Sequence, residues 1–123
     1  MRIWRAIMVG VIACTWDVMA SVIRPSETEA SWYGEDHRGK PMANGKPFVP
    51  EDLTCASWFY PLGTRLDVRR VGSRRCVTVT VTDRGPARRL VRRGRAIDLS
   101  AAAFHRLADL DRGLVRVSIR IIK

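Results

Sequence analysis

Two aspartates at the ends of predicted strands are the residues of this sequence best placed to do chemistry. Asp83 follows an alternating valine and threonine run at residues 77–82, and Asp98 lies in a second apolar segment at residues 96–99. Alternation with a period of two predicts a half-buried strand. Two carboxyl groups in one site can exchange a proton with a polar ligand. The alternative is that each aspartate only closes a turn or caps backbone donors.

The segment that joins the two aspartates is strongly basic. Gly85 and Pro86 end the first strand, because glycine permits unusual backbone angles and proline lacks a donor. The chain carries 22 Lys and Arg against 12 Asp and Glu, a formal net charge of +10. Guanidinium groups suit carboxylate and phosphate, so the segment predicts an anionic ligand. Its arginines are Arg84, Arg88, Arg89, Arg92, Arg93 and Arg95.

Two classes of partner fit such a basic segment, and a third interpretation needs no partner. In a cell envelope the anions would be peptide carboxylates of the wall, anionic polymers or lipid head groups. Nucleic acid is the rival class, since a basic patch is also the electrostatic footprint of a nucleic-acid binder. No nucleic-acid motif accompanies the patch, so we do not expect that partner. A solvated basic face without a specific ligand is the remaining alternative.

Strands dominate the elements that must position these residues. A helix is predicted at residues 100–110, where Ser100 supplies an N-cap, and one helical turn is predicted at residues 53–57. The irregular segment at residues 35–51 contains Asn44-Gly45, a pair suited to a tight turn. One domain with this pattern favours an all-β barrel. The predicted strands cover residues 31–33, 65–71, 77–83, 96–99 and 114–122.

Five short motifs occur in the order found in a known protein family. Together they cover nearly everything from residue 30 to residue 123, and the chain resembles the double-psi β-barrel domains of the rare lipoprotein A (RlpA)-like family of septal ring lytic transglycosylases. The resemblance implies a mainly β fold, a six-stranded double-psi β-barrel with one short helix. It also implies endolytic cleavage of naked, peptide-poor glycan strands of peptidoglycan during cell-wall remodelling. The motifs are ASWYG at residues 30–34, MANG at 42–45, YPLGTRL at 60–66, TDRGP at 82–86 and AIDLS at 96–100.

The resemblance suggests roles for individual side chains. Asp83 and Asp98 would share the catalytic site, one as the acid and base and the other keeping its partner protonated by like-charge proximity. By similarity to expansin-type barrels, Ser31 would hydrogen-bond one of them. Aromatic residues favour both strands and sugar contact, with core packing as the alternative. The further candidates for substrate contact are Trp32, Tyr33, Asn44, Arg84 and Arg88.

Three positions depart from the pattern of active family members. Those members carry an acid directly after the Asn-Gly pair, another acid three positions later, and a histidine before the Pro-Leu-Gly turn. This chain has Lys46, Val49 and Ser57 there. A non-catalytic, expansin-like module that binds glycan is therefore the alternative function, and a structural role at the division septum is a third class.

The first twenty residues predict export. Arg2 and Arg5 precede an apolar run that is too short for a permanent membrane span. Two routes stay open: cleavage near Ala20, or lipidation at Cys14 after a lipobox-like sequence. A buried N-terminal helix is the alternative. We thus expect a signal segment at residues 1–20, a linker at 21–29 and the barrel at 30–123, as a monomer in the periplasm or cell envelope.

The cysteines and histidines predict a disulfide but no metal site. If Cys14 is removed or acylated, Cys55 and Cys76 remain as one possible pair in an exported protein. Two free thiols are the alternative. His37 and His105 are far apart, and no Cys-x-x-Cys spacing occurs, so we expect no metal and no cofactor.

Overall fold

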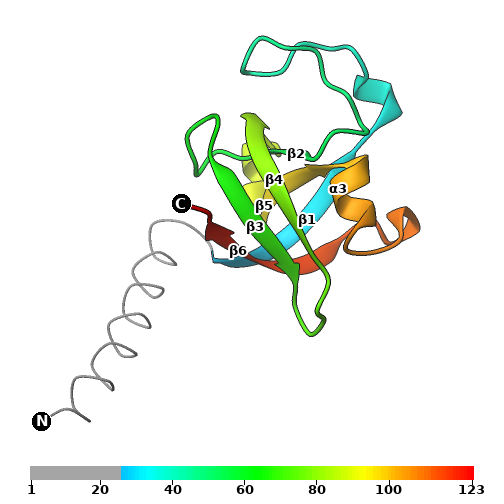
Figure 1. Ribbon diagram of the computed structural model, residues 1–123, viewed down its shortest axis with the longest axis vertical. Helices are drawn as coiled ribbons and strands as arrows, with labels where there is room; N and C mark the ends of the chain where they lie inside the picture. The colour runs from blue at the N-terminus through cyan, green and yellow to red at the C-terminus, as the bar shows by residue number, and fades with distance from the viewer. Residues whose placement is uncertain (1–25) are drawn as a thin grey trace, which may run out of the picture.

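Six strands close into a barrel (Figure 1). The computed structural model describes residues 26–123. Around the barrel the strands follow the order β1-β5-β2-β4-β3-β6. The mainly β, six-stranded prediction is therefore confirmed. The strands are β1 (Glu27–Tyr33), β2 (Thr54–Ala56), β3 (Arg65–Arg70), β4 (Cys76–Asp83), β5 (Arg95–Ser100) and β6 (Val115–Ile121).

The N-terminal predictions lie largely outside the described residues. The predicted signal segment at residues 1–20, with Cys14, is entirely outside them, and so is most of the predicted linker. Strand β1 begins at Glu27, three residues before the predicted start of the barrel. Within residues 26–123, no helix has the length and apolar character needed to cross a membrane.

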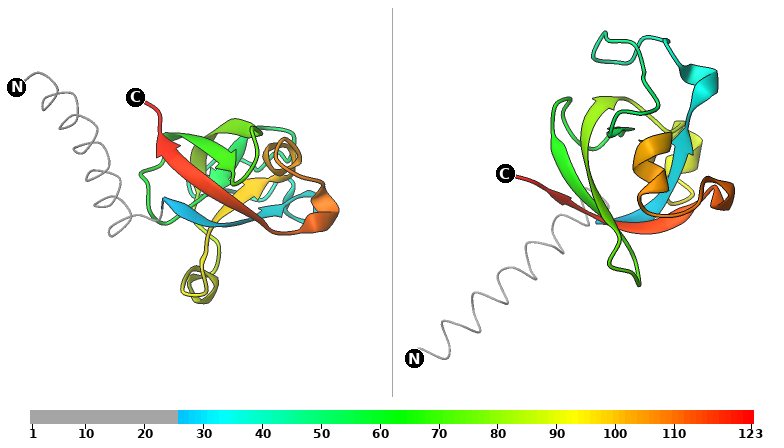
Figure 2. Two further views of the ribbon diagram at one scale, coloured as in Figure 1. Left: turned by 90° about the horizontal axis from the view of Figure 1, so that it is seen from below. Right: turned by 45° about the vertical axis from the view of Figure 1, so that its right-hand side comes forward.

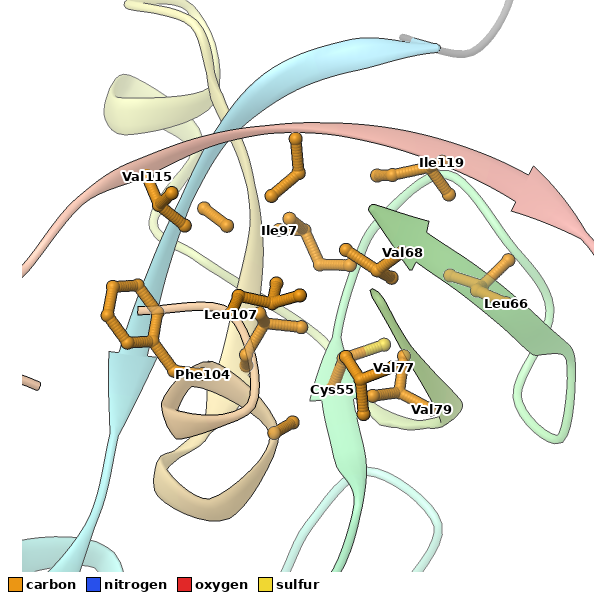
Figure 3. Close-up of a cluster of buried hydrophobic side chains, with 14 of the residues drawn as sticks. Cys55, Leu66, Val68, Val77, Val79, Ile97, Phe104, Leu107, Val115 and Ile119 are labelled. Atoms are coloured by element: carbon orange, nitrogen blue, oxygen red, sulfur yellow. The ribbon is translucent and has the colours of Figure 1, made fainter. Parts of the chain in front are cut away.

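Inward side chains of every strand fill the barrel interior (Figure 3). On β4 the alternation is as predicted, with Val77, Val79 and Val81 almost fully buried. The helix α3 (Ala101–His105) adds Phe104 to the same cluster. A small barrel needs such filling because its interior is only as wide as the side chains that pack there. Other buried members are Leu66, Val68, Ile97, Leu99, Leu107, Val115, Val117 and Ile119.

A long arm formed by residues 34–53 arches over one end of the barrel (Figure 1). It begins with a short 3-10 helix, η1 (Glu35–His37), and folds back on itself, so that the Gly39 amide donates to the Phe48 carbonyl and the Phe48 amide to the Lys40 carbonyl, both at 2.9 Å. The predicted Asn44-Gly45 turn forms its tip, where Gly45 has φ of 86° and donates its N–H to the Met42 carbonyl. The base of the arm is held by the ring of Phe48, stacked on Tyr33 at 4.2 Å.

Two predictions of local structure were wrong. Residues 53–57 form no helical turn; β2 runs there instead, because Cys55 and Ala56 are buried and pair with β4 and β5 on either side. Ser100 does cap α3, accepting a hydrogen bond from the Ala103 amide at 3.2 Å, but the helix ends at His105. Residues 107 and 108 still bury their side chains, and the Ala108 amide donates to the Phe104 carbonyl at 2.9 Å.

The predicted disulfide is also wrong, because both cysteines are free. Cys55 lies opposite Val81 of β4, whereas Cys76 begins that strand and lies opposite Arg69. Five residues of strand correspond to about 16 Å, and a disulfide needs Cα atoms less than about 7 Å apart. Cys55 is buried in the core and Cys76 is exposed.

The basic segment between the two aspartates forms a small projection. It contains the short helix α2 (Arg88–Val91), which stands out from the barrel wall in the left view of Figure 2. Four of its arginines, Arg88, Arg89, Arg92 and Arg93, are exposed. A second 3-10 turn, η2 (Leu110–Arg112), leads into β6.

Candidate active site

Strand β2 lies between the strands that carry the two candidate aspartates. Its last residue, Ala56, is paired with Asp83 of β4 on one side and with Asp98 of β5 on the other. Two strand spacings put the backbones of the aspartates roughly 10 Å apart. We call Asp83, Ala56 and Asp98 the carboxylate row. A register shift after Cys55 places Asp83, rather than Thr82, in this row, as expected of irregular pairing that re-aims a side chain.

The small side chain of Ala56 lets the row be compact. A Cβ atom added to Gly85 would lie 3.3 Å from the Ala56 Cβ, so the turn after β4 passes directly over that residue. Larger side chains at either position would push the turn away from β2. Ala56 was not among the candidate residues, because a lone alanine carries no chemical signal in a sequence.

Backbone amides hold Asp83 in place. Its Oδ1 accepts the N–H of Ala43, at the tip of the arm, at 2.9 Å and the N–H of Arg84 at 2.8 Å. The amide of Asn44 donates to the Thr82 carbonyl at 3.1 Å and docks the same tip on β4. Both hydrogen bonds to this carboxylate within residues 26–123 involve Oδ1, which leaves Oδ2 for a substrate.

Asp98 occupies a more enclosed position. Its neighbours Ile97 and Leu99 point into the core, and its Oδ1 accepts the Ser31 hydroxyl at 3.0 Å, the contact predicted for Ser31. Burial raises the pKa of Asp98 above its usual value, and the negative charge of Asp83 adds to the rise. The Ser31 hydrogen bond and the charges of Arg95 and His37 oppose it in part. A raised pKa favours the protonated form that a general acid needs.

Tyr33 adds a buried hydroxyl beside the row. Its oxygen has no hydrogen-bond partner within residues 26–123. Burial raises the pKa of Tyr33, and the charges of Asp83 and Asp98 raise it further. The Tyr33 ring stacks on Phe48 and makes an edge-to-face contact with His37, with the ring centroids 5.5 Å apart. The ring face predicted to contact sugar is therefore covered by Phe48, and the hydroxyl oxygen is buried as well.

Arg84 ties the segment after β2 to the turn after β4. Its guanidinium Nη1 donates to the carbonyls of Ser57 at 2.7 Å and Tyr60 at 2.6 Å. The Ser57 amide donates in return to the Asp83 carbonyl at 3.0 Å. Arg84 was predicted to bind substrate, and its recorded contacts are with the backbone that surrounds the site.

Three other residues singled out from the sequence make side-chain hydrogen bonds to the backbone. Trp32 packs against the core and donates its indole N–H to the Leu110 carbonyl at 3.0 Å. The Asn44 side chain accepts the amide of Lys46 within the tip of the arm. The Ser57 hydroxyl accepts the Phe59 amide and is buried. Two residues that sequence analysis did not select, His37 and Trp58, lie at the site. Neither belongs to a pattern, so only the fold could identify them.

No metal ligand set converges in the part of the chain that the structure describes. Within residues 26–123 no three His, Cys, Asp or Glu side chains come together as a metal site requires. The carboxyl groups of the site can transfer protons, supported by hydroxyl and amide hydrogen bonds.

Comparison with known proteins assigns this site to a family. A family model described as lytic transglycolase matches residues 26–119. The chain belongs to this family. A relative from Synechocystis sp., named "Probable endolytic peptidoglycan transglycosylase RlpA", is 36% identical over 109 residues, which cover 89% of this chain and 33% of the relative. The "Endolytic peptidoglycan transglycosylase RlpA" of Campylobacter jejuni is 37% identical over 93 residues, 76% of this chain and 32% of that protein.

The lytic transglycolase match covers one part of longer proteins. The chain spans about a third of the length of these curated relatives. A small Synechocystis protein described as uncharacterized is 37% identical over 90 residues and is itself covered to 91%.

Solved structures show the same barrel. An expansin from Clavibacter michiganensis superposes with a TM-score of 0.60 at 25% identity, over 80% of this chain and 50% of the expansin. The Streptomyces papain inhibitor gives a TM-score of 0.56 at 27% identity, over 75% of this chain and 90% of the inhibitor. The double-psi β-barrel prediction is thereby confirmed for this member of the lytic transglycolase family.

Proposed function

We propose that this protein is an endolytic peptidoglycan lytic transglycosylase that cleaves peptide-poor glycan strands. The observation that supports this function best is the carboxylate row, in which a partly buried Asp98 with a raised pKa lies two strands from Asp83. The names of the RlpA relatives point to the same reaction.

In this reaction Asp98 supplies one proton and takes one back. Its protonated carboxyl group donates to the glycosidic oxygen as the bond from that oxygen to C1 of the muramyl sugar breaks. The C6 hydroxyl oxygen of the same sugar forms a new bond to C1, and its proton passes to the Asp98 carboxylate. The product ends in an anhydro-muramyl sugar, no water is consumed, and the acid is restored. One carboxyl group suffices if its pKa is raised toward neutrality.

Asp83 stabilises the positive charge that develops at C1. Its Oδ1 is fixed by the amides of Ala43 and Arg84, so Oδ2 can face the sugar without reorganising the site. The hydroxyl of Ser31 orients Asp98.

The test is incubation of the full-length chain with peptide-free glycan strands, followed by mass spectrometry. We expect products that end in anhydro-muramyl sugars. Products with an ordinary reducing end would instead indicate hydrolysis.

The alternative is a glycan-binding module without catalysis. It is favoured by Lys46, Val49 and Ser57, which replace two acids and a histidine, and by the expansin-like barrel. A chain that sediments with purified sacculi but yields no product would establish this alternative.

We also propose that the protein is exported and acts in the periplasm or cell envelope. The basic residues and apolar run before Cys14 support export, and lipidation would occur at Cys14. Under the lipoprotein route, Cys14→Ser should release the protein from membranes. Recovery of the chain from the cytoplasm with an intact N-terminus would contradict export by either route.

A further inference from the structure

Trp58 is an exposed aromatic residue beside the carboxylate row. It follows the buried Ser57, two residues after Ala56, and 41% of its surface is exposed. Aromatic side chains of this size usually gain stability from burial, so an indole left this open is available for contact with a ligand.

The position of Trp58 is fixed by four hydrogen bonds between residues 57–60 and the turn after β4. Its indole N–H donates to the Pro86 carbonyl at 2.7 Å. The Ser57 amide donates to the Asp83 carbonyl, and Arg84 donates to the carbonyls of Ser57 and Tyr60. The same turn therefore holds both Asp83 and the indole. A ring held in this way loses little conformational freedom when a ligand stacks on it.

Arg88 accompanies the indole. Its guanidinium carbon lies 4.5 Å from the centroid of the Trp58 ring. None of the four ion pairs recorded within residues 26–123 includes Arg88. A guanidinium group can stack on an aromatic ring and pair with a carboxylate through its edge at the same time.

We propose that Trp58 and Arg88 form a subsite for a sugar ring that carries a carboxylate, next to the carboxylate row. The C–H face of the sugar packs on the indole, and the acidic substituent pairs with Arg88. The identity of the polymer rests on the proposed function, because a muramyl glycan carries a lactyl carboxylate on alternate sugars. Such a glycan carries an anion on only every second sugar, and Arg88 pairs with one of these lactyl carboxylates beside the row.

A polynucleotide would also offer stacking surfaces and anions to such a pair. The two carboxylates of the row disfavour it, because every linkage of that polymer carries a negative charge. The sugar ligand is the better match to the charges of the site.

The test compares two oligosaccharides of equal length by calorimetric titration of the full-length chain. One is a neutral N-acetylglucosamine oligomer and the other is a peptide-free glycan that alternates N-acetylglucosamine and N-acetylmuramic acid. An Asp98→Asn background prevents consumption of the ligand. Trp58→Ala should weaken both ligands roughly tenfold, the equivalent of about 1.4 kcal/mol. Trp58→Phe should retain most of the affinity.

Arg88→Gln should weaken only the muramyl glycan, by several-fold, and leave the neutral oligomer unchanged. The matched control is Arg74→Gln, which removes the same charge from an exposed position between β3 and β4 and should alter neither ligand. Circular dichroism and thermal unfolding of each variant establish that it is folded.

Unchanged affinity for both glycans in a folded Trp58→Ala variant would overturn the subsite. Tighter binding of single-stranded polynucleotide, weakened by the same substitutions, would overturn the choice of sugar. If Trp58-dependent glycan binding is found but the wild-type chain forms no anhydro product, the subsite stands and the proposed reaction fails. If product forms with the same KM in Trp58→Ala, the reaction stands and the subsite fails.

Discussion

The two halves of the barrel wall are built differently. Strand β3 pairs with β4 and β6 in antiparallel register without shifts, and its outward residues Asp67 and Arg69 form an exposed ion pair. In the other half, β1 with β5 and β2 with β4 are parallel, and each pairing contains a register shift. There the outward residues Ser31, Tyr33 and Asp98 are at least partly buried.

The difference separates stability from chemistry within one small barrel. In the regular half, polar side chains stay in water and cost little to place. In the irregular half, a carboxyl group and a phenol are partly withdrawn from water, a cost that folding stability alone would not favour. Matched substitutions in the two halves can test whether this division is real.

The largest expected effect is on catalysis by Asp98→Asn. The amide can still accept the Ser31 hydrogen bond but cannot deliver a proton, so formation of anhydro product should fall roughly 1,000-fold. Asp67→Asn, the matched change in the regular half, should leave the rate unaltered. Equal rates for wild type and a folded Asp98→Asn variant, measured by mass spectrometry of products, would remove Asp98 from the mechanism.

A smaller loss is expected for Asp83→Asn. The substitution keeps an oxygen for the amides of Ala43 and Arg84 but removes the charge beside C1, and we expect a roughly 100-fold fall in kcat. Thermal unfolding should change little. Undiminished turnover would show that the carboxylate row works with Asp98 alone.

We expect binding to purified sacculi to weaken several-fold when the basic segment that contains α2 loses three of its charges. Arg89, Arg92 and Arg93 are exposed, and exposed charges are screened within about 10 Å at 0.1 M salt. Replacing all three by Gln should weaken binding and flatten its dependence on salt. The control removes three exposed charges elsewhere, at Arg65, Arg74 and Arg120. Equal losses of affinity in both triple variants would mean that the net charge of the protein, rather than the basic segment that contains α2, causes binding to the cell wall.

The smallest effect concerns stability and its dependence on pH. Because the folded-state pKa of Asp98 is raised, the folded protein binds this proton more tightly than the unfolded chain, and stability falls as pH rises from about 3.9 through the folded value. Asp98→Asn should therefore raise Tm at neutral pH, and the gain should vanish in acid. Asp67→Asn should not raise Tm at any pH. A neutral-pH loss of Tm in Asp98→Asn would contradict the cost assigned to the irregular half.

The regular half was predictable from sequence and the irregular half only in part. In β4, valines at positions 77, 79 and 81 alternate with threonines, and apolar and polar residues alternate likewise in β6. This alternation with a period of two identified both strands. Strand β2 has three residues, too few to show a period. The motifs supplied Asp83 and Asp98 as a pair, but their meeting across Ala56 depends on parallel pairing and a register shift. Local sequence does not encode such long-range register.

The strand order also governs when the barrel can form. Strand β1 is the first of the six to be synthesised, yet its neighbours are β5 and β6, which come last. The wall therefore cannot close until residues 115–121 have joined it, and no early hairpin contains β1. Pairings between distant segments slow folding, because closing a long loop costs conformational entropy before the contacts between its ends form. The barrel of a nascent chain thus stays open until its final strand arrives, and a truncation before β6 would leave β1 and β3 as unprotected edges prone to aggregation.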